Sequence, residues 1–304
     1  MWRYRIAGIE VATDIPLPGA QIPASVATVP EVTIRRGPVP QTLDGATSSG
    51  GDWMMRQDSF LWRVPHVARF LIRGGREIEF SVEDAADEGD VVIYLLGSAF
   101  GILLHQRGYL VLHASAVEVR GKAVLFCGPS GAGKSTLAAA LSNAGYAFLN
   151  DDVCHIRVDG GIEPKIAPDG RFLKLWGDAL HQLTLEDRKG AAVGKSLDKF
   201  YVAPPDARRA EAVPLGAAYG LRAGSGAQPI AFEKLDAAQA VMLFRENAYR
   251  PLLVSQMKLE RSYFTDSIAA LRRANAFYLT RPIDYSAMAE MIRRLERHWA
   301  EIGL

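Results

Sequence analysis

Cysteine is scarce in this sequence: Cys127 and Cys154 are the only two among 304 residues. Two cysteines cannot build a disulfide framework, and no group of cysteines and histidines has the spacing of zinc ligands. We therefore expect a reducing compartment and no structural zinc.

Net charge is also nearly absent, because 35 Lys and Arg stand against 34 Asp and Glu, which leaves a formal charge of +1. Such a balance produces no overall field that would hold the protein on nucleic acid or on an anionic membrane. We therefore expect neither as a partner, and any anion must be bound locally.

Long apolar runs are missing as well. The longest, Val91–Leu104, contains two glycines and a serine and is shorter than the roughly 20 residues of a membrane span. We expect it to be a buried helix. The segment Met1–Gly8 is followed by Asp14 and several prolines, without the apolar core and cleavage site of a signal peptide. The expectation is a cytoplasmic protein.

What is present is a composition typical of globular proteins, with 49% hydrophobic and 23% charged residues. The length predicts one large or two ordinary domains. Residues 1–88 are rich in short β-prone pieces broken by Pro and Gly, which predicts a small β-rich N-terminal domain. The acidic run Glu83–Asp90 marks the expected boundary, with a second domain over residues 89–304.

The second domain changes pattern. Strands are expected near 109–113, 115–119 and 122–127, a helix near 134–144, and strands near 146–149 and 153–158. This strand, loop, helix, strand order is typical of α/β nucleotide-binding folds. A loop-rich section to about 212 precedes strands near 213–222 and 229–233. A helix capped by Asp236 follows, then a largely helical tail over 251–274 and 285–301 around a strand at 276–280.

A glycine loop carries the strongest functional signal. It fits the phosphate-loop pattern G-x-x-x-x-G-K-[ST], follows an apolar strand and opens a helix, which is the setting the motif requires. Its backbone N–H groups and the helix N-terminus can surround phosphate groups. The predicted nucleotide-binding residues are Gly128, Pro129, Ser130, Gly131, Ala132, Gly133, Lys134, Ser135 and Thr136.

The loop predicts ATP and Mg²⁺ as ligands. Lys134 is expected to reach the β- and γ-phosphates, and the Ser135 hydroxyl is expected to bind magnesium. The next strand ends in Asn150-Asp151-Asp152, which places two carboxylates beside the phosphates. One suits magnesium and the other a proton from a hydroxyl nucleophile. An Asx turn that only closes the strand is the alternative.

Phosphoryl transfer also needs cations close to the equatorial oxygens of the transferred phosphoryl group. Among the cations of the middle section, which include Arg171, Lys174 and Arg188, we select Lys195 and Lys199. Exposed lysines without a role are the alternative interpretation of both.

Three ordered motifs give this region a family resemblance: Leu112-His113-Ala114-Ser115-Ala116, the loop Gly128–Ser135, and Asn150-Asp151-Asp152. Over roughly residues 108–160 the sequence resembles the catalytic domain of HPr kinase/phosphorylase, in which a histidine precedes the phosphate loop and an Asp-Asp pair follows it. By itself, His113 on an apolar strand would fit a core residue equally well.

The resemblance implies a phosphate-loop kinase fold related to phosphoenolpyruvate carboxykinase, and ATP-dependent phosphorylation of a protein serine. It implies Asp151 as general base, His113 as the group that orients it, and Asp152 as magnesium ligand, with the reverse order of the two aspartates left open. The usual His-Gly is His113-Ala114 here, which leaves the reverse phosphorylase activity open.

The layout of the whole chain is similar to HPr-kinase-related enzymes of ribosomal-peptide maturation, notably lasso-peptide precursor kinases. This implies a peptide or small-protein substrate that carries a serine. A small-metabolite kinase and an ATP-hydrolysing regulatory module remain alternatives, and a homo-oligomer is left open.

Overall fold

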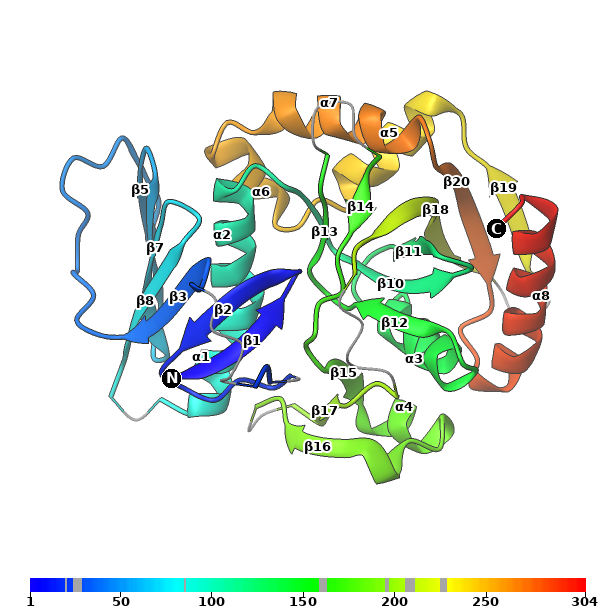
Figure 1. Cartoon of the computed structure of the whole chain (residues 1–304), viewed down its shortest axis with the longest axis horizontal. Coiled ribbons are helices and arrows are strands. Elements are labelled where there is room, and N and C mark those ends of the chain that lie inside the picture. The colour runs from blue at the N-terminus through cyan, green and yellow to red at the C-terminus, as the bar shows by residue number, and fades with distance from the viewer. Residues whose placement is uncertain are drawn as a thin grey trace.

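The computed structural model describes residues 1–19, 21–23, 29–84, 86–158, 163–194, 197–205, 211–224 and 229–304. Within these ranges two large sheets stand side by side, and a long helix lies between them (Figure 1). The fold is α/β, as expected.

The N-terminal sheet has the strand order β1-β2-β3-β8-β7-β6-β5-β4. Its strands are β1 (Trp2–Ile6), β2 (Ile9–Thr13), β3 (Val32–Arg36), β4 (Ser48–Ser49), β5 (Trp53–Arg56), β6 (Ser59–Val64), β7 (Ala68–Arg73) and β8 (Glu77–Val82). The β-rich character of this region is confirmed. Strands β1 and β2 form a hairpin that turns at Ala7 and Gly8, both with positive φ.

The long helix consists of α1 (Glu88–Tyr94), a π-helical turn (Leu95–Ala99) and α2 (Phe100–Gln106). Its apolar residues share one core with the N-terminal sheet, among them Leu95, Phe100 and Leu103. Since this helix lies beyond the expected boundary at residue 88, the first residues of the second domain pack on the first. The boundary itself stays a prediction.

This helix, Glu88–Gln106, is the one helix in the described ranges with the length and composition of a membrane span. Its apolar window is 67% buried inside the molecule. The apolar residues of this helix pack against the N-terminal sheet, as those of a core helix do.

The central sheet has the order β12-β10-β11-β18-β20-β19, and β14 also pairs with β18. Its strands are β10 (Ala114–Val119), β11 (Lys122–Cys127), β12 (Ala147–Asn150), β14 (Lys165–Ile166), β18 (Val213–Ala223), β19 (Ala231–Lys234) and β20 (Asn275–Arg281). Strands β11, β18 and β20 are parallel neighbours, so their carboxyl ends meet at one edge. A ligand of an open α/β sheet binds at such an edge.

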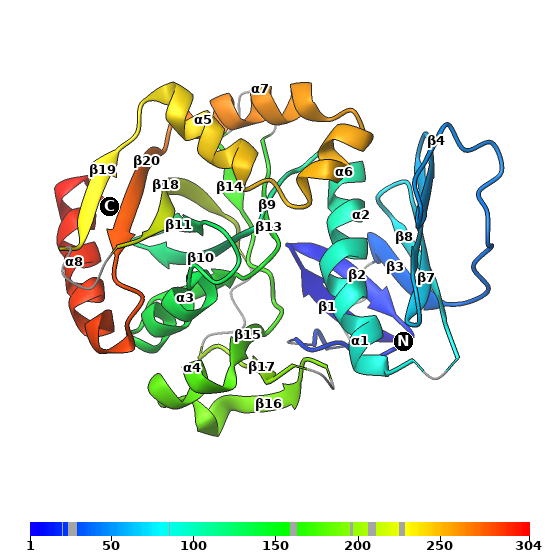
Figure 2. The ribbon, with the colours of Figure 1, turned by 180° about the vertical axis from the view of Figure 1, so that it is seen from behind.

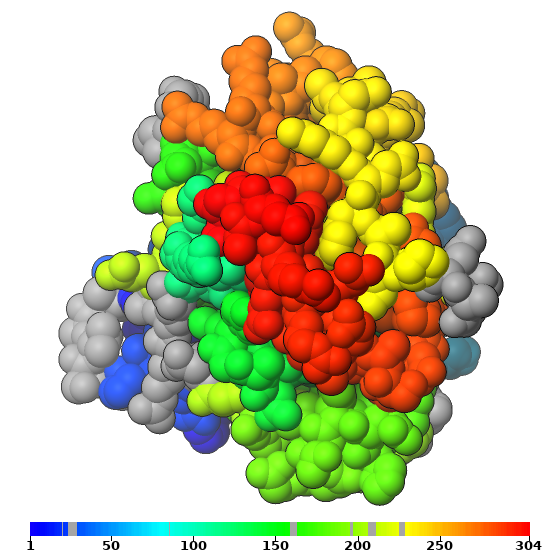
Figure 3. Space-filling model, turned by 90° about the vertical axis from the view of Figure 1, so that its right-hand side faces the viewer, coloured from blue at the N-terminus to red at the C-terminus, as the bar shows by residue number. Residues whose placement is uncertain are grey.

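Helices cover both faces of the central sheet. The side chains of β11 alternate, with Leu125 and Cys127 in the core that includes α5 (Ala237–Glu246) and α7 (Glu260–Leu271). Val124 and Phe126 face the core formed with α3 (Lys134–Asn143) and α8 (Met288–Glu301). In Figure 2 α5 and α7 lie above the sheet, whereas α3 lies below it and α8 at its left side. In Figure 3 α8 crosses the visible face in red.

The middle section is more ordered than the loop-rich stretch we expected. It contains a small sheet of β15 (Leu173–Trp176), β17 (Lys199–Val202) and β16 (Lys189–Ala192), with α4 (Gly177–Gln182) and a 3₁₀ turn (Glu186–Arg188). The pair β9 (Leu110–Leu112) and β13 (Cys154–Ile156) lies beside the central sheet.

The expected helix over 251–274 is in fact two helices, α6 (Pro251–Gln256) and α7, and this prediction was wrong in its continuity. Lys258 has a positive φ of 58° between them, which a continuous α-helix does not allow. A 3₁₀ turn (Tyr285–Ala287) precedes α8.

Candidate active site

The glycine loop connects β11 to α3, as the motif requires. Gly131 and Gly133 have φ angles of 84° and 78°, a region in which a Cβ atom is strained. A Cβ at Gly133 would also lie 2.5 Å from Arg281 Nη2. The two glycines therefore have a steric reason that the motif alone did not show, and the predicted phosphate loop is confirmed as a structural element.

Lys134 is buried at the first turn of α3, where it is 6% exposed. Its Nζ donates to the carbonyl oxygens of Gly128, at 2.8 Å, and Pro129, at 3.0 Å. Burial lowers the pKa of Lys134, against the opposing effect of nearby Asp151. The ammonium group thus lies in its own loop, held by carbonyls that phosphate oxygens can replace.

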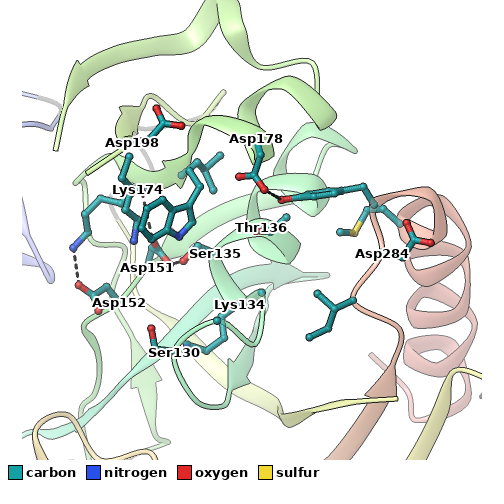
Figure 4. Close-up of a pocket in the computed structure, with 18 of the residues that line it drawn as sticks. Ser130, Lys134, Ser135, Thr136, Asp151, Asp152, Lys174, Asp178, Asp198 and Asp284 are labelled. Atoms are coloured by element: carbon teal, nitrogen blue, oxygen red, sulfur yellow. Dashed lines mark hydrogen bonds and ion pairs between the residues drawn. The ribbon is translucent and has the colours of Figure 1, made fainter. Parts of the chain in front are cut away.

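Asp151 accepts two short hydrogen bonds on Oδ1, from Ser135 Oγ and from Ser115 Oγ, each at 2.7 Å. Ser135 is the loop residue expected to bind magnesium, so Asp151 lies on the metal side of the pair. Ser115 belongs to the strand block that was singled out, but no role was assigned to it. Figure 4 shows Asp151 and Ser135 together at the wall of the pocket.

Asp152 faces a different set of partners. His113 Nδ1 lies 3.1 Å from its Oδ1, and Lys174 Nζ lies 2.6 Å from its Oδ2. Burial alone would raise the pKa of Asp152, but Lys174 and His113 outweigh it and hold the pKa well below its usual range. The backbone of Asp152 has a positive φ of 72°, which is an uncommon conformation for a residue other than glycine.

The expected cations are divided by the structure. Lys199 lines the pocket and lies 5.6 Å from the centre of the Trp176 ring, and burial lowers its pKa. Lys195 lies outside the described residues. Lys174, which we had set aside, is the lysine that pairs with Asp152. Arg171 is used elsewhere, in a buried ion pair with Asp169.

Arg281 is a residue that sequence reasoning missed. It ends β20, is 4% exposed, and donates from Nη2 to the carbonyl of Ala132 at 2.8 Å. Its Nε has no hydrogen-bond partner among the described residues, and burial lowers its pKa. A buried guanidinium without a carboxylate partner favours an anionic ligand beside it. No local sequence signal marks Arg281, because only the strand order brings β20 near the loop.

Two cavities share Asp152 in their lining, whereas Asp151 lines only the first. The first, about 660 Å³, is lined by loop residues including Ser130, Lys134, Ser135 and Thr136, and by Arg281. The second, about 700 Å³, reaches from Gly128 and Pro129 toward the long helix and α6. Both are lined by His113, Ser130, Asp152 and Lys174. The geometry thus offers one compartment on each side of Asp152.

The donor atoms fit magnesium. Ser135 Oγ and the Asp151 carboxylate are hard oxygen ligands within hydrogen-bond distance of each other, and Mg²⁺ bound with a nucleotide takes one or two protein oxygens, phosphates and waters. Among the described residues, no group of three or more His, Cys, Asp or Glu side chains could hold a metal on its own. Cys127 and Cys154 are buried, and burial raises the pKa of both thiols.

This fold and site define a phosphate-loop α/β protein whose nucleotide pocket lies beside a His-Asp-Lys group. Residues 124–193 match a family model described as an AAA domain. Among solved structures, the chain is similar to the HPr(Ser) kinase/phosphatase from Coxiella burnetii, with 14% identity over 63% of this chain and 98% of that chain, at a TM-score of 0.31. No curated protein matches the sequence.

Proposed function

We propose that the protein is a magnesium-dependent kinase that transfers the γ-phosphoryl group of ATP to a hydroxyl group. The observation that carries the proposal is the position of Asp152 between two cavities, while Asp151 contacts the loop hydroxyl of Ser135. A switch ATPase needs a nucleotide pocket alone, whereas a kinase needs a second compartment for the acceptor.

The first cavity takes the nucleotide in this proposal. Lys134 and Arg281 supply positive charge at the loop, and Lys199 supplies it from β17. Ser135 and Asp151 would hold Mg²⁺, which neutralises charge on the phosphates when bound. This assigns the metal to Asp151 and so reverses the order that the resemblance implied.

Asp152 is the general base in this assignment. Because Lys174 and His113 keep its pKa low, the carboxylate is ionised at neutral pH and can accept the hydroxyl proton. As that proton moves to Asp152, the acceptor oxygen bonds to the γ-phosphorus, the bond from the γ-phosphorus to the β–γ bridging oxygen breaks, and ADP leaves. His113 positions the carboxylate from its other side.

The acceptor that we propose is a serine hydroxyl of a peptide or small protein, a lasso-type precursor peptide in particular, and the location is the cytoplasm, where ATP is available. The motif resemblance and the layout of the chain support this acceptor. A small-metabolite kinase is the second candidate, favoured by the second cavity, whose volume of about 700 Å³ suits a small ligand.

Incubation with γ-labelled ATP, Mg²⁺ and the product of a neighbouring small open reading frame tests the proposal. We expect label on a serine of the peptide. Lys134→Ala should lower transfer by about 10²–10³-fold, since a preorganised charge on the phosphates is lost. Lys122→Ala, which removes an exposed lysine at the start of β11, is the matched control. Transfer at an undiminished rate in Lys134→Ala would contradict the nucleotide site.

A further inference from the structure

The second cavity is built by three parts of the chain. The long helix contributes Ile93, Tyr94, Gly97 and Ser98, and the turn between α5 and α6 contributes residues 246–251. The start of the phosphate loop and the group around Asp152 complete it. In both Figure 1 and Figure 2, α6 lies beside α2 at this junction. The cavity therefore exists only where the N-terminal sheet's helix meets the phosphate-loop domain.

The turn before α6 is held in an unusual conformation. Arg250 has a φ of 53°, which costs a non-glycine residue free energy and persists where surrounding structure imposes it. Its Nη2 donates to Ser98 Oγ at 2.7 Å. That bond joins the turn to the π-helical segment of the long helix.

Tyr249 fixes the same turn by packing against the long helix. A Cβ on Gly101 would lie 2.5 Å from Tyr249 Cε1, and one on Gly97 would lie 3.3 Å from Tyr249 Oη. The two glycines thus give the Tyr249 ring its place against the helix. Arg250 is therefore fixed at the cavity wall by the packing of Tyr249, the residue before it, and by its own hydrogen bond to Ser98.

We propose that this cavity is the phosphoryl-acceptor site and that Arg250 binds an anionic group, a carboxylate or a phosphate, of the acceptor. The proposal rests on the kinase function proposed above. Arginine offers five N–H donors in a planar fork that matches such oxyanions, and Ser98 takes one of them. The hydroxyl of the same acceptor then faces Asp152.

The positive charge that is held in place at the cavity favours an anion. Beyond the residues shared with the first cavity, the charged lining residues are Arg250 and Glu246, and both are exposed. Arg250 is tied to the helix through Ser98, so binding an anion there loses little side-chain freedom. The shared residues Lys174 and Asp152 pair with each other, which leaves Arg250 as the fixed cation for a further anion.

In the proposed reaction the two cavities, Asp152 and Arg250 have separate roles. The acceptor oxygen attacks the γ-phosphorus of ATP from the second cavity, its proton passes to Asp152, and ADP departs on the side of the first cavity. Arg250 takes no part in the bond changes. It sets where the hydroxyl lies, so its loss should raise the KM for the acceptor more than it lowers kcat.

Two pairs of probes test the proposal and separate the sources of the anion. A short peptide that ends in serine is compared as free carboxylate and as amide, and glycerol 3-phosphate is compared with glycerol, each with labelled ATP and Mg²⁺. We expect one anionic member to accept phosphate about tenfold or more faster than its neutral twin, the factor of one charged hydrogen bond. Arg250→Met should abolish this preference, and Arg250→Lys should keep part of it.

ATP binding, measured separately by titration, should stay unchanged in every variant. The control is Arg261→Met, which removes an exposed arginine of α7 that does not line the cavity, and Glu246→Gln tests the other charge. Four outcomes would overturn the acceptor site. The charged and neutral members of both pairs could react at equal rates, or neither anionic probe could accept phosphate although ATP binds. The preference for the anionic probe could also persist in Arg250→Met, or be lost in Glu246→Gln. Absence of ATP binding in the unmodified protein would instead overturn the kinase proposal.

Discussion

Two adjacent aspartates at the end of one strand have different surroundings, and this difference supports the roles proposed for them. Asp151 receives hydroxyl donors from Ser115 and Ser135, whereas Asp152 receives an ammonium and an imidazole. Sequence order alone could not show this, because Ser115, His113 and Lys174 come from segments distant in the chain.

Asparagine substitutions at the two positions should have unlike effects. Asp152→Asn keeps the shape but loses the base, so single-turnover transfer should fall by about 10²–10⁴-fold with ATP affinity little changed. Asp151→Asn should mainly weaken magnesium, seen as a higher Mg²⁺ concentration for half-maximal rate. Single-turnover rates across a magnesium titration measure both. The reverse pattern would restore Asp151 as the base, and normal rates in both variants would refute the mechanism.

His155 is a second residue whose surroundings set its chemistry. It is fully buried on β13, and neither ring nitrogen has a hydrogen-bond partner among the described residues. Burial lowers its pKa to about 3, and burial likewise lowers that of His105 to about 4. Below the unfolded pKa near 6.5, the unfolded chain binds protons that the folded protein does not, so stability decreases as pH falls.

His155→Phe should therefore reduce the sensitivity of the fold to acid. Between pH 7 and pH 5 the native protein should lose about 2 kcal/mol more of its free energy of unfolding than the variant, from the proton uptake of one histidine. Urea unfolding at both pH values measures this difference. If the free energy of unfolding changes equally between pH 7 and pH 5 in His155→Phe and in the native protein, His155 is not buried in its neutral form.

At the scale of elements, the sequence predicted what local chemistry determines. The phosphate loop, the strands on either side of it and the helix after Asp236 all occur as expected, because glycine, apolar periodicity and a capping residue act within a few neighbours. The break at Lys258 and the strands β15 and β16 were missed, since none of them has a strong local signal, whereas the strand expected at residues 200–202 occurs as β17. Arg281 and Lys174 were missed as site residues because sheet order, which is long-range, brings them to the loop.

The helix after Asp236 allows a direct measurement of one such local signal. Asp236 accepts a hydrogen bond from the backbone of Gln239 at 2.8 Å, and the Gln239 side chain accepts one from the backbone of Asp236 at 3.0 Å. Asp236→Ala should destabilise the protein by about 1 kcal/mol, the typical value of an N-cap, and Asp236→Asn should cost much less. Chemical unfolding of both variants decides, and equal stabilities would mean that the helix does not depend on its cap.

At the scale of the whole molecule, one buried ion pair links the two sheets. Arg171 Nη2 lies 2.6 Å from Asp169 Oδ2, and the side chains of Asp169 and Arg171 are 2% and 9% exposed. Arg171 also donates to the carbonyl of Leu96 in the long helix, and the backbone carbonyl of Asp169 accepts from Ala7 of the first hairpin. Asp169 also donates from its backbone to the carbonyl of Leu149 on β12, so the pair connects the N-terminal hairpin, the long helix and the edge of the central sheet.

Arg171→Met tests whether this link also maintains the proposed acceptor cavity, one wall of which is the long helix. Loss of one partner leaves Asp169 buried and unpaired, so the free energy of unfolding should drop by about 3–5 kcal/mol. The double variant Arg171→Met with Asp169→Asn should recover much of that loss, because no unpaired charge remains. Because the double variant still lacks the bond to Leu96, we expect its transfer rate to stay low while its ATP affinity is normal. A double variant with full transfer would show that the helix holds its place without Arg171, and a single variant as stable as the native protein would show that the pair is not desolvated.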